Sequence, residues 1–396
     1  MGESEQEEPI RSRLPKQVWI LSVVGFLIAI GFGVMSPILP IYARTFGVSS
    51  FLIGLVLSSL SVFRLITMPA SSWLTRIIGP REIAIAGNVM VAFTTFMIGI
   101  ADSYWGLLLW RGLSGFGSAM YGVSSLALLF SSTPAHMRGR ASSLSGGGFV
   151  LGGMAGPAIG GLISAISLQA PFFFYSATLM SAAIVLTITL PRTPIEQREK
   201  LRQASIGLRD LVKDSRFRAV IAMNFGTGWQ SFGVRNMLIP LFIVESLNMK
   251  TSWVGIAFTL SAVAQAASIH SIGTAVDRLG RRTMMIAGGL LTASMSIGLA
   301  LTRSYVVMII LMCLYAIGVS ASNAASQAML ADAVPVSAAS GLAAYQMASD
   351  IGLILGPMVA GIVIDAISLP WAWTFGAGII LVGVGLAWVT PKHVPH

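Results

Sequence analysis

The chain has 396 residues, of which 55% are hydrophobic and 10% are charged. Soluble domains carry about 25% charged residues. The low charged fraction and the large apolar fraction of this chain therefore predict that it lies in a lipid bilayer. The single cysteine, Cys313, excludes a disulfide within the chain, and the four histidines show no ligand spacing, so neither a metal nor a cofactor is expected. Because most of the basic residues lie in loops between apolar segments, the net charge of +10 does not indicate a nucleic-acid partner.

Twelve apolar segments approach or exceed the roughly 20 residues that a helix needs to cross the hydrocarbon core. They lie at 17–42, 52–74, 82–101, 105–131, 141–166, 171–190, 218–244, 252–276, 283–301, 305–330, 341–367 and 371–390. If the N-terminus is cytoplasmic, 19 of the 25 basic residues are cytoplasmic and three are in external loops. The positive-inside rule therefore predicts a multi-pass protein of the plasma or inner cell membrane, with both termini in the cytoplasm.

The fifth apolar segment contains "FVLGGMAGPAIGG" at 149–161. Helices in lipid associate through close packing of small residues, and Gly152, Gly156 and Gly160 form such a stripe. Pro157 is expected to kink the helix, with neighbouring groups satisfying the freed carbonyl. Static helix packing is the simpler alternative for this stretch.

A polar segment at 191–217 separates six apolar segments from six. The expected organisation is a cytoplasmic tail at 1–16, a six-helix bundle at 17–190, a cytoplasmic linker at 191–217, a second six-helix bundle at 218–390 and a cytoplasmic tail at 391–396.

The two groups repeat each other with an offset of about 200 residues. "FGVMSPILP" at 32–40 returns as "FGVRNMLIP" at 232–240, and Gly54 returns as Gly255. The Gly-Pro stretch returns as "GLILGPMVAG" at 352–361. Parallel six-helix repeats predict a pseudo-two-fold axis along the membrane normal, with a binding site near the midplane between the halves. The fold class is therefore an all-α membrane protein of twelve transmembrane helices in two bundles.

Three motifs identify the chain as resembling the major facilitator superfamily, in particular its twelve-helix drug/proton antiporters. Arg111-Gly-Leu-Ser114-Gly115 resembles their fourth-helix motif. Their fifth-helix motif is matched at Gly152, Gly156, Pro157, Gly160 and Gly161. Their signature loop is matched by "GTAVDRLGRR", with Gly273, Asp277, Arg278, Gly280, Arg281 and Arg282.

The resemblance implies that Asp277 latches the cytoplasmic side across the two halves, while the loop arginines hold the loop at the anionic inner leaflet. Topology signalling by the arginines alone is the alternative. The first-half copy of the loop, "SSWLTRIIGPRE" at 71–82, lacks the acid, which predicts an asymmetric gate. The first helix also lacks the acidic residue that many of these antiporters keep there.

Ionisable residues inside apolar segments are expensive in lipid, so they are candidates for charge or proton coupling. Asp350 is placed about 13 Å from the inner end of its helix and Arg64 about 18 Å from the outer end of its own. Because the family places the second and eleventh helices face to face, an Arg64–Asp350 pair is expected that weakens when Asp350 is protonated. A local hydrogen bond of Asp350 within its own half is the alternative.

Three further residues have two interpretations each. Arg111 matches the family's proton-linked arginine, or is a structural arginine bonded to backbone carbonyls. Arg235 steers an anionic substrate, or extends outward to the membrane surface. His270 titrates near neutral pH, or is a hydrogen-bonded packing residue.

The family lines its central cavity with the first, fourth, seventh and tenth helices. Aromatic, methionine and amide side chains there suit bulky amphipathic molecules, with lipid-facing or packing roles as the alternative. The candidates are Tyr121, Asn224, Phe225, Trp229, Gln230, Phe232, Arg235, Asn236, Tyr315, Asn323 and Gln327.

These features predict a monomeric secondary transporter that exports amphipathic, drug-like small molecules in exchange for protons by alternating access. Its expected partners are the substrate, protons and the lipid bilayer. The rival is a proton-coupled or facilitative transporter of an anionic metabolite or a lipid-like molecule. A receptor is disfavoured by the short external loops, and an enzyme by the absence of GxSxG and HExxH patterns.

Overall fold

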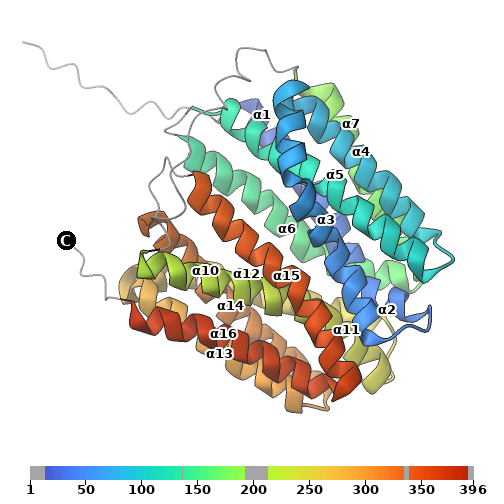
Figure 1. The fold of residues 1–396 in the computed structure, drawn as a ribbon, viewed down its shortest axis with the longest axis vertical. Helices are drawn as coiled ribbons and strands as arrows, with labels where there is room; N and C mark the ends of the chain where they lie inside the picture. The colour runs from blue at the N-terminus through green and yellow to red at the C-terminus, as the bar shows by residue number, and fades with distance from the viewer. Residues whose placement is uncertain (1–13, 135–136, 192–212, 334–338, 391–396) are drawn as a thin grey trace, which may run out of the picture.

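The structure is a computed structural model that describes residues 14–134, 137–191, 213–333 and 339–390. The described part is helical, and its first half forms one bundle (Figure 1). The helices of this half are α1 (Lys16–Met35), α2 (Leu39–Arg44), α3 (Ser50–Ile77), α4 (Pro80–Gly99), α5 (Tyr104–Ser131), α6 (Arg138–Ser164) and α7 (Ala170–Thr189).

The second half forms the other bundle in Figure 1. Its elements are α10 (Ser215–Thr227), η2 (Gly228–Val234), α11 (Arg235–Leu241), η3 (Phe242–Ser246), α12 (Ser252–Leu279), α13 (Arg281–Leu301), α14 (Tyr305–Ala333), α15 (Ala339–Ala366) and α16 (Leu369–Val389). We call the end where α1 and α10 begin the linker end, and the end where α2 finishes and α3 begins the distal end.

Eleven segments in the described ranges are long and apolar enough to span a membrane. The twelfth expected span, 218–244, is present but is not one α-helix, because π-helical turns η2 and η3 interrupt it and it begins at Ser215. The first expected span is also irregular: α1 and α2 are separated by a turn at Ser36–Ile38, which contains Pro37 and precedes Pro40. Irregular backbone at membrane depth is tolerated where protein or a water-filled cavity surrounds it.

The packing of the first half is repeated in the second. Tyr104 of α5 donates to the Leu52 carbonyl at 3.0 Å, and Tyr305 of α14 donates to the Trp253 carbonyl at 2.8 Å. Both members of these pairs are offset by 201 residues, as Gly54 and Gly255 are. The offset is 200 at Pro40 and Pro240, so the second half contains one additional residue in the interval occupied by η3.

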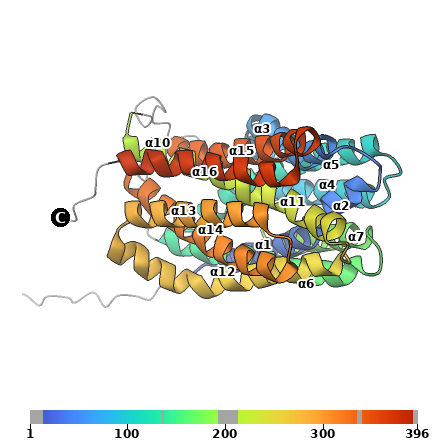
Figure 2. The ribbon, with the colours of Figure 1, turned by 90° about the horizontal axis from the view of Figure 1, so that it is seen from below.

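Two pairs of long helices join the halves: α3 packs against α15, and α6 packs against α12. We call these contacts the α3–α15 seam and the α6–α12 seam. Figure 2 shows these two contacts along opposite edges of the molecule. This arrangement is the one expected from two bundles related by a pseudo-two-fold axis.

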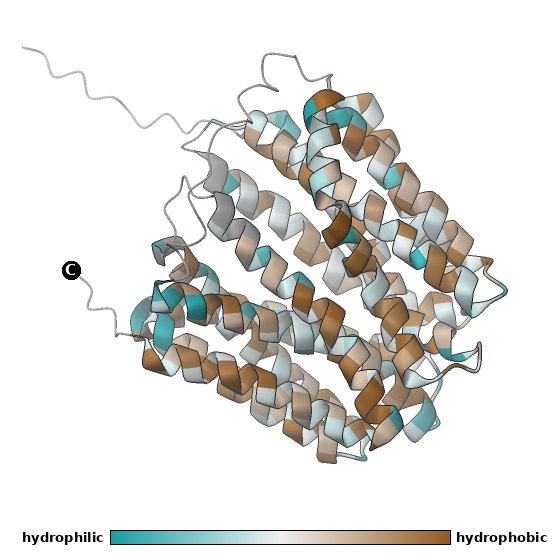
Figure 3. Cartoon of the chain, viewed as in Figure 1, coloured by the Kyte–Doolittle hydropathy of each residue, from teal (hydrophilic) through white to brown (hydrophobic). Residues whose placement is uncertain are grey.

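Large apolar side chains cover the outer surface of the bundles. Leu162, Ile166, Ile188, Leu301 and Val389 are each more than 70% exposed. Figure 3 shows hydrophobic residues along the lengths of the helices and hydrophilic ones concentrated toward their ends. A surface of this kind suits lipid and not water, which agrees with a multi-pass membrane protein.

Candidate functional site

The glycine stripe of α6 packs against α1 within the first half. A Cβ on Gly152 would lie 2.5 Å from the Phe26 carbonyl oxygen, and one on Gly160 would lie 2.5 Å from the Val34 carbonyl oxygen. Gly156 likewise faces Gly33 of α1, with only 2.6 Å from its added Cβ to the Gly33 Cα. Helix packing therefore accounts for these three glycines.

The remaining motif residues of α6 lie at the junction with the second half. A Cβ on Gly255 of α12 would lie 2.5 Å from the Pro157 carbonyl oxygen and 2.6 Å from Gly161 Cα. The other seam repeats this contact, because a Cβ on Gly54 of α3 would collide with the Pro357 carbonyl of α15. Each Gly-Pro stretch thus meets a glycine of the opposite half, which allows the two backbones to approach closely.

The α3–α15 seam also carries polar bonds. Arg64 and Asp350 form an ion pair across it, so the alternative of a purely local bond for Asp350 is wrong. Asp350 is 7% exposed, and Ser58 Oγ of α3 donates to the Ile354 carbonyl of α15 at 2.6 Å. No hydrogen bond or ion pair links α6 to α12 among the residues that the structure describes.

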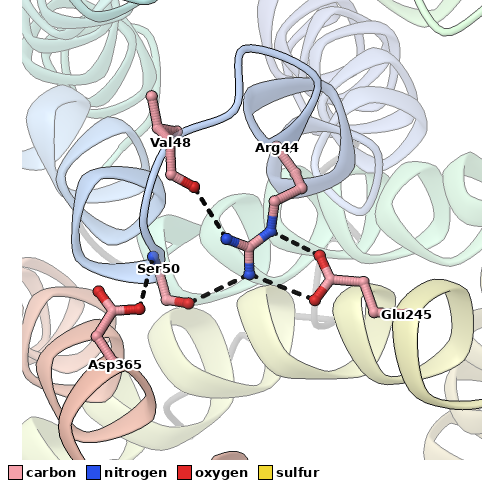
Figure 4. Close-up of polar contacts among 5 residues, drawn as sticks. All are labelled: Arg44, Val48, Ser50, Glu245 and Asp365. Carbon is pink, nitrogen blue, oxygen red and sulfur yellow. Dashed lines mark hydrogen bonds and ion pairs between the residues drawn. The ribbon is translucent and has the colours of Figure 1, made fainter.

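The distal end contains a cross-half cluster of charged residues (Figure 4). Arg44 Nε is 2.6 Å from Glu245 Oε1, and the Arg44 guanidinium also donates to the Val48 carbonyl at 2.9 Å and to Ser50 Oγ at 3.2 Å. Asp365 of α15 accepts the backbone N–H groups of Ser50 at 3.0 Å and Phe51 at 2.9 Å.

These distal contacts join the ends of α2, α3, η3 and α15. The Asp365 carboxylate satisfies two of the free N–H groups in the first turn of α3 and faces the positive end of the helix dipole. Arg44, Glu245 and Asp365 were absent from the residues selected from the sequence. For Arg44 and Glu245 the available signal was the repeat, because Glu245 stands 201 residues after Arg44 with the opposite charge.

Two arginines lie near the contact between the irregular first and seventh spans. Arg111 of α5 is 5% exposed, and its guanidinium contacts Met35 Sδ at 3.9 Å. Asn236 Nδ2 donates to Ser36 Oγ at 3.4 Å across the two halves. The neighbouring Arg235 has its guanidinium over the rings of Phe258 and Tyr315, at 5.4 and 5.8 Å from their centroids.

These positions remove two of the earlier interpretations. Arg111 makes no hydrogen bond to a backbone carbonyl among the described residues, so that structural role is wrong. Arg235 points toward aromatic side chains of α12 and α14, so it does not extend outward to the membrane surface. The Nε atom of each arginine is buried without a hydrogen-bond partner.

Three of the amide and aromatic candidates in the seventh span are packing residues. Asn224 donates to the Tyr345 carbonyl of α15 at 2.5 Å, and Gln230 donates to Ser296 Oγ of α13 at 3.0 Å. Trp229 is 4% exposed between Phe225 and Phe375. In this conformation all three side chains contact helices of their own half, and their role in a cavity wall stays a prediction.

The other cavity candidates are more accessible, except for Tyr315, which is fully buried and bonded to Ser231 at 2.9 Å. Phe225 lines a cavity of about 430 Å³ between α10 and α15 near the linker end, whose walls are mostly apolar. Phe232 is exposed, as is Gln327 of α14, and Tyr121, Asn236 and Asn323 are partly exposed.

The signature loop is bonded within the second half. Arg281 pairs with Asp332 and donates to the Ala328 carbonyl at 3.0 Å, while Arg282 donates to the Ala387 carbonyl at 3.1 Å. Asp277 and Arg278 are exposed, and neither makes an ion pair in the described ranges. No described residue of the first half bonds to Asp277 in this conformation, in which the halves are joined at the distal end.

Other parts of the loop have local roles. Gly280 and its first-half counterpart Gly79 both have positive φ, at 88° and 120°, which favours glycine. Gly273 lies in open space on α12, one turn from His270. His270 is exposed and its side chain bonds to no described residue, so the packing role expected for it is wrong.

The sequence model of the Major Facilitator Superfamily matches residues 21–252 and 223–396, which together cover most of the chain. The chain therefore belongs to the major facilitator superfamily. It is a transporter by family and fold, and a multi-pass membrane protein.

Two relatives share part or most of the chain's length. The chain is 23% identical to an uncharacterized MFS-type transporter of Methanocaldococcus jannaschii, over 94% of this chain and 97% of that protein. It is 28% identical to the quinolone resistance protein NorA of Staphylococcus aureus, over 45% of this chain and 46% of NorA.

Solved structures share the fold at low identity. A bacterial homolog of the human lysosomal transporter Spinster, inward-facing and occupied, has a TM-score of 0.77 at 16% identity, over 96% of this chain and 98% of that one. The nucleoside transporter NupG has a TM-score of 0.75 at 18% identity, over 94% and 98%.

Proposed function

We propose that the chain is a monomeric secondary transporter of the cell membrane that exports amphipathic small molecules in exchange for protons by alternating access. The observation that carries the proposal is the Arg64–Asp350 ion pair, in which a buried carboxylate of one half is bound to the other half. Protonation of Asp350 removes its charge and with it the strongest part of this cross-half bond. A proton can thereby change the relative stability of the two conformations.

The distal contacts supply the second part of the proposal. With both termini in the cytoplasm, the distal end is the external end, and the Arg44–Glu245 pair and the Asp365 cap hold it closed. Asp277, whose side chain is exposed here, would form its cross-half bond when the linker end closes instead. The partial match to NorA supports an amphipathic substrate, and the quinolones that NorA's name records are suitable probes.

The test uses proteoliposomes with an imposed pH gradient, a trapped fluorescent pH indicator and a quinolone as the probe. We expect quinolone flux to be accompanied by opposite proton flux in the wild type. Asp350→Asn should abolish the coupling because it cannot gain or lose a proton. Asp102→Asn, which changes an exposed distal carboxylate, should leave the coupling intact. Full coupling in Asp350→Asn would refute the role of this residue.

A further inference from the structure

The buried charges of the molecule do not balance. Among the residues that the structure describes, the carboxylates other than Asp350 lie near the distal end (Asp102, Glu245, Asp365) or the linker end (Glu82, Asp214, Asp277, Asp332). Asp350 is bound to Arg64. Arg111 and Arg235 consequently have no carboxylate at ion-pair distance within the described ranges, which leaves two cationic groups uncompensated at membrane depth.

The two arginines occupy opposite positions in the two repeats. Arg235 stands 200 residues after Met35, and Met312 stands 201 residues after Arg111. The first half therefore has a methionine on its first span and an arginine on its fourth, whereas the second half has these two residue types exchanged. The exchange places the two arginines on α5 and α11, which belong to different halves.

A chain of contacts connects the two arginines across the halves. Arg111 contacts Met35, whose neighbour Ser36 accepts a hydrogen bond from Asn236, and Asn236 adjoins Arg235. Arg111 lies about 10 Å from the distal end of α5, at seven residues and 1.5 Å per residue. Ser36, Arg235 and Asn236 are partly exposed, whereas Arg111 is 5% exposed.

Both guanidinium groups retain unused donors. Arg111 has only a thioether sulfur, a weak acceptor, at 3.9 Å, and its Nε is buried without a partner. Arg235 presents its guanidinium to two aromatic rings, and its Nε is also unpaired. Buried donors and buried charges without partners are strongly unfavourable, and carboxylate or phosphate oxygens match the geometry of a guanidinium.

We infer that the substrate is an amphipathic organic anion whose acidic group binds between Arg111 and Arg235, with Asn236 as an additional donor and its apolar part near Met35 and Phe258. This inference rests on the proposed transport function and names its substrate class. The acidic group is a carboxylate, sulfonate or phosphate monoester. It supplies a negative charge, which no described residue at ion-pair distance from these arginines provides.

The test measures binding without any gradient, so that it is independent of proton coupling. Equilibrium dialysis of the purified full chain in detergent is performed with 1-naphthoate, naphthalene-1-sulfonate and 1-naphthyl phosphate, and with the cation 1-naphthylmethylammonium of similar size. We expect at least one anion to bind about tenfold or more tightly than the cation, since two charge-assisted hydrogen-bonding groups favour it. Equal or weaker binding of all three anions would overturn the inference.

The variants assign that preference to the two arginines. Arg111→Gln and Arg235→Gln should each weaken anion binding about tenfold, and the Lys variants should weaken it less because they keep the charge. Arg303→Gln, at an exposed distal position, should change nothing. Variants that elute as folded protein and bind the anions like the wild type would also overturn the inference. Quinolone–proton exchange is measured in a separate assay and could still occur in that case. Failure of this inference is therefore distinguishable from failure of the transport proposal.

Discussion

Arg44 and Glu245 lie at corresponding ends of the two repeats, and their side chains bind each other across the two halves that the pseudo-two-fold axis relates. The Arg44 Nε and terminal nitrogen lie 2.6 and 3.3 Å from the two Glu245 carboxylate oxygens, as in a bidentate pair. Ser36 and Asn236, offset by 200 residues, meet in the same way. Residues near such an axis face their own counterparts, so divergence of the two copies can create complementary pairs there.

The first prediction concerns this pair. Glu245→Gln removes one charge from partly exposed groups, whose pairing contributes about 0.2–1 kcal/mol, so the distal-open population should rise by a factor of about 1.4 to 5. The measurement is the alkylation rate of Ser36→Cys by an impermeant maleimide applied from the distal side, in a Cys313→Ala background that removes the natural thiol. Asp102→Asn is the control, and an unchanged rate in Glu245→Gln would contradict the prediction.

Asp365 provides a second, independent test of distal closure. Asp365→Ala removes both acceptors of the α3 N-terminus, a loss of about 0.5–2 kcal/mol for a helix cap. Asp365→Asn keeps one acceptor oxygen, so it should increase alkylation of Ser36→Cys less than Asp365→Ala does. Asp102→Ala serves as the control because it also removes an exposed distal carboxylate. Equal labelling in both Asp365 variants and the parent would show that the cap does not hold the halves together.

The seam glycines should be intolerant of even one additional carbon. Gly255→Ala places its Cβ 2.5 Å from a backbone oxygen, and Gly54→Ala places one against the Pro357 backbone. Both variants should prevent full distal closure and greatly reduce transport while remaining folded, because the clash exists only when the seams are closed. Transport assays and size-exclusion chromatography check this prediction. Gly122→Ala and Gly378→Ala, which face open space, should transport normally.

The duplicated tyrosines give a prediction about stability. Tyr104→Phe and Tyr305→Phe each delete one hydrogen bond to a backbone carbonyl, of 3.0 and 2.8 Å. Each should lower the free energy of unfolding by about 0.5–1.5 kcal/mol, and by similar amounts, because the two surroundings are repeats of each other. Thermal unfolding in detergent provides the comparison. A large effect at one position alone would show that the halves differ in local stability.

Much of the fold was predictable because it depends on composition and repetition. Apolar segment length located the spans, and the offset of about 200 residues identified two equivalent bundles. The depth argument for Arg64 and Asp350 also placed two side chains correctly, since position along a helix converts directly into depth. The contact of Gly54 and Gly255 with the opposite Gly-Pro stretches required the three-dimensional arrangement.

The directions of individual side chains were less predictable. Asn224, Trp229 and Gln230 face their own half, and the seventh span contains the π-helical segments η2 and η3, which change the angular position of successive residues. The sequence pattern gives no clear signal for a π-turn, so the cavity-facing side could not be assigned. Asp277 differs for another reason: its side chain is exposed and forms no ion pair with a described residue, so the latch expected for it stays a prediction.

The two seams impose unequal resistance to separation. The α3–α15 seam has an ion pair, a side-chain hydrogen bond and the Asp365 cap, whereas described residues of α6 and α12 meet through glycine and proline backbone. Separation of the two halves should therefore begin beside α6 and α12, where fewer polar bonds have to break. Acyl chains along that edge must rearrange in every cycle, which makes turnover sensitive to the fluidity of the surrounding lipid.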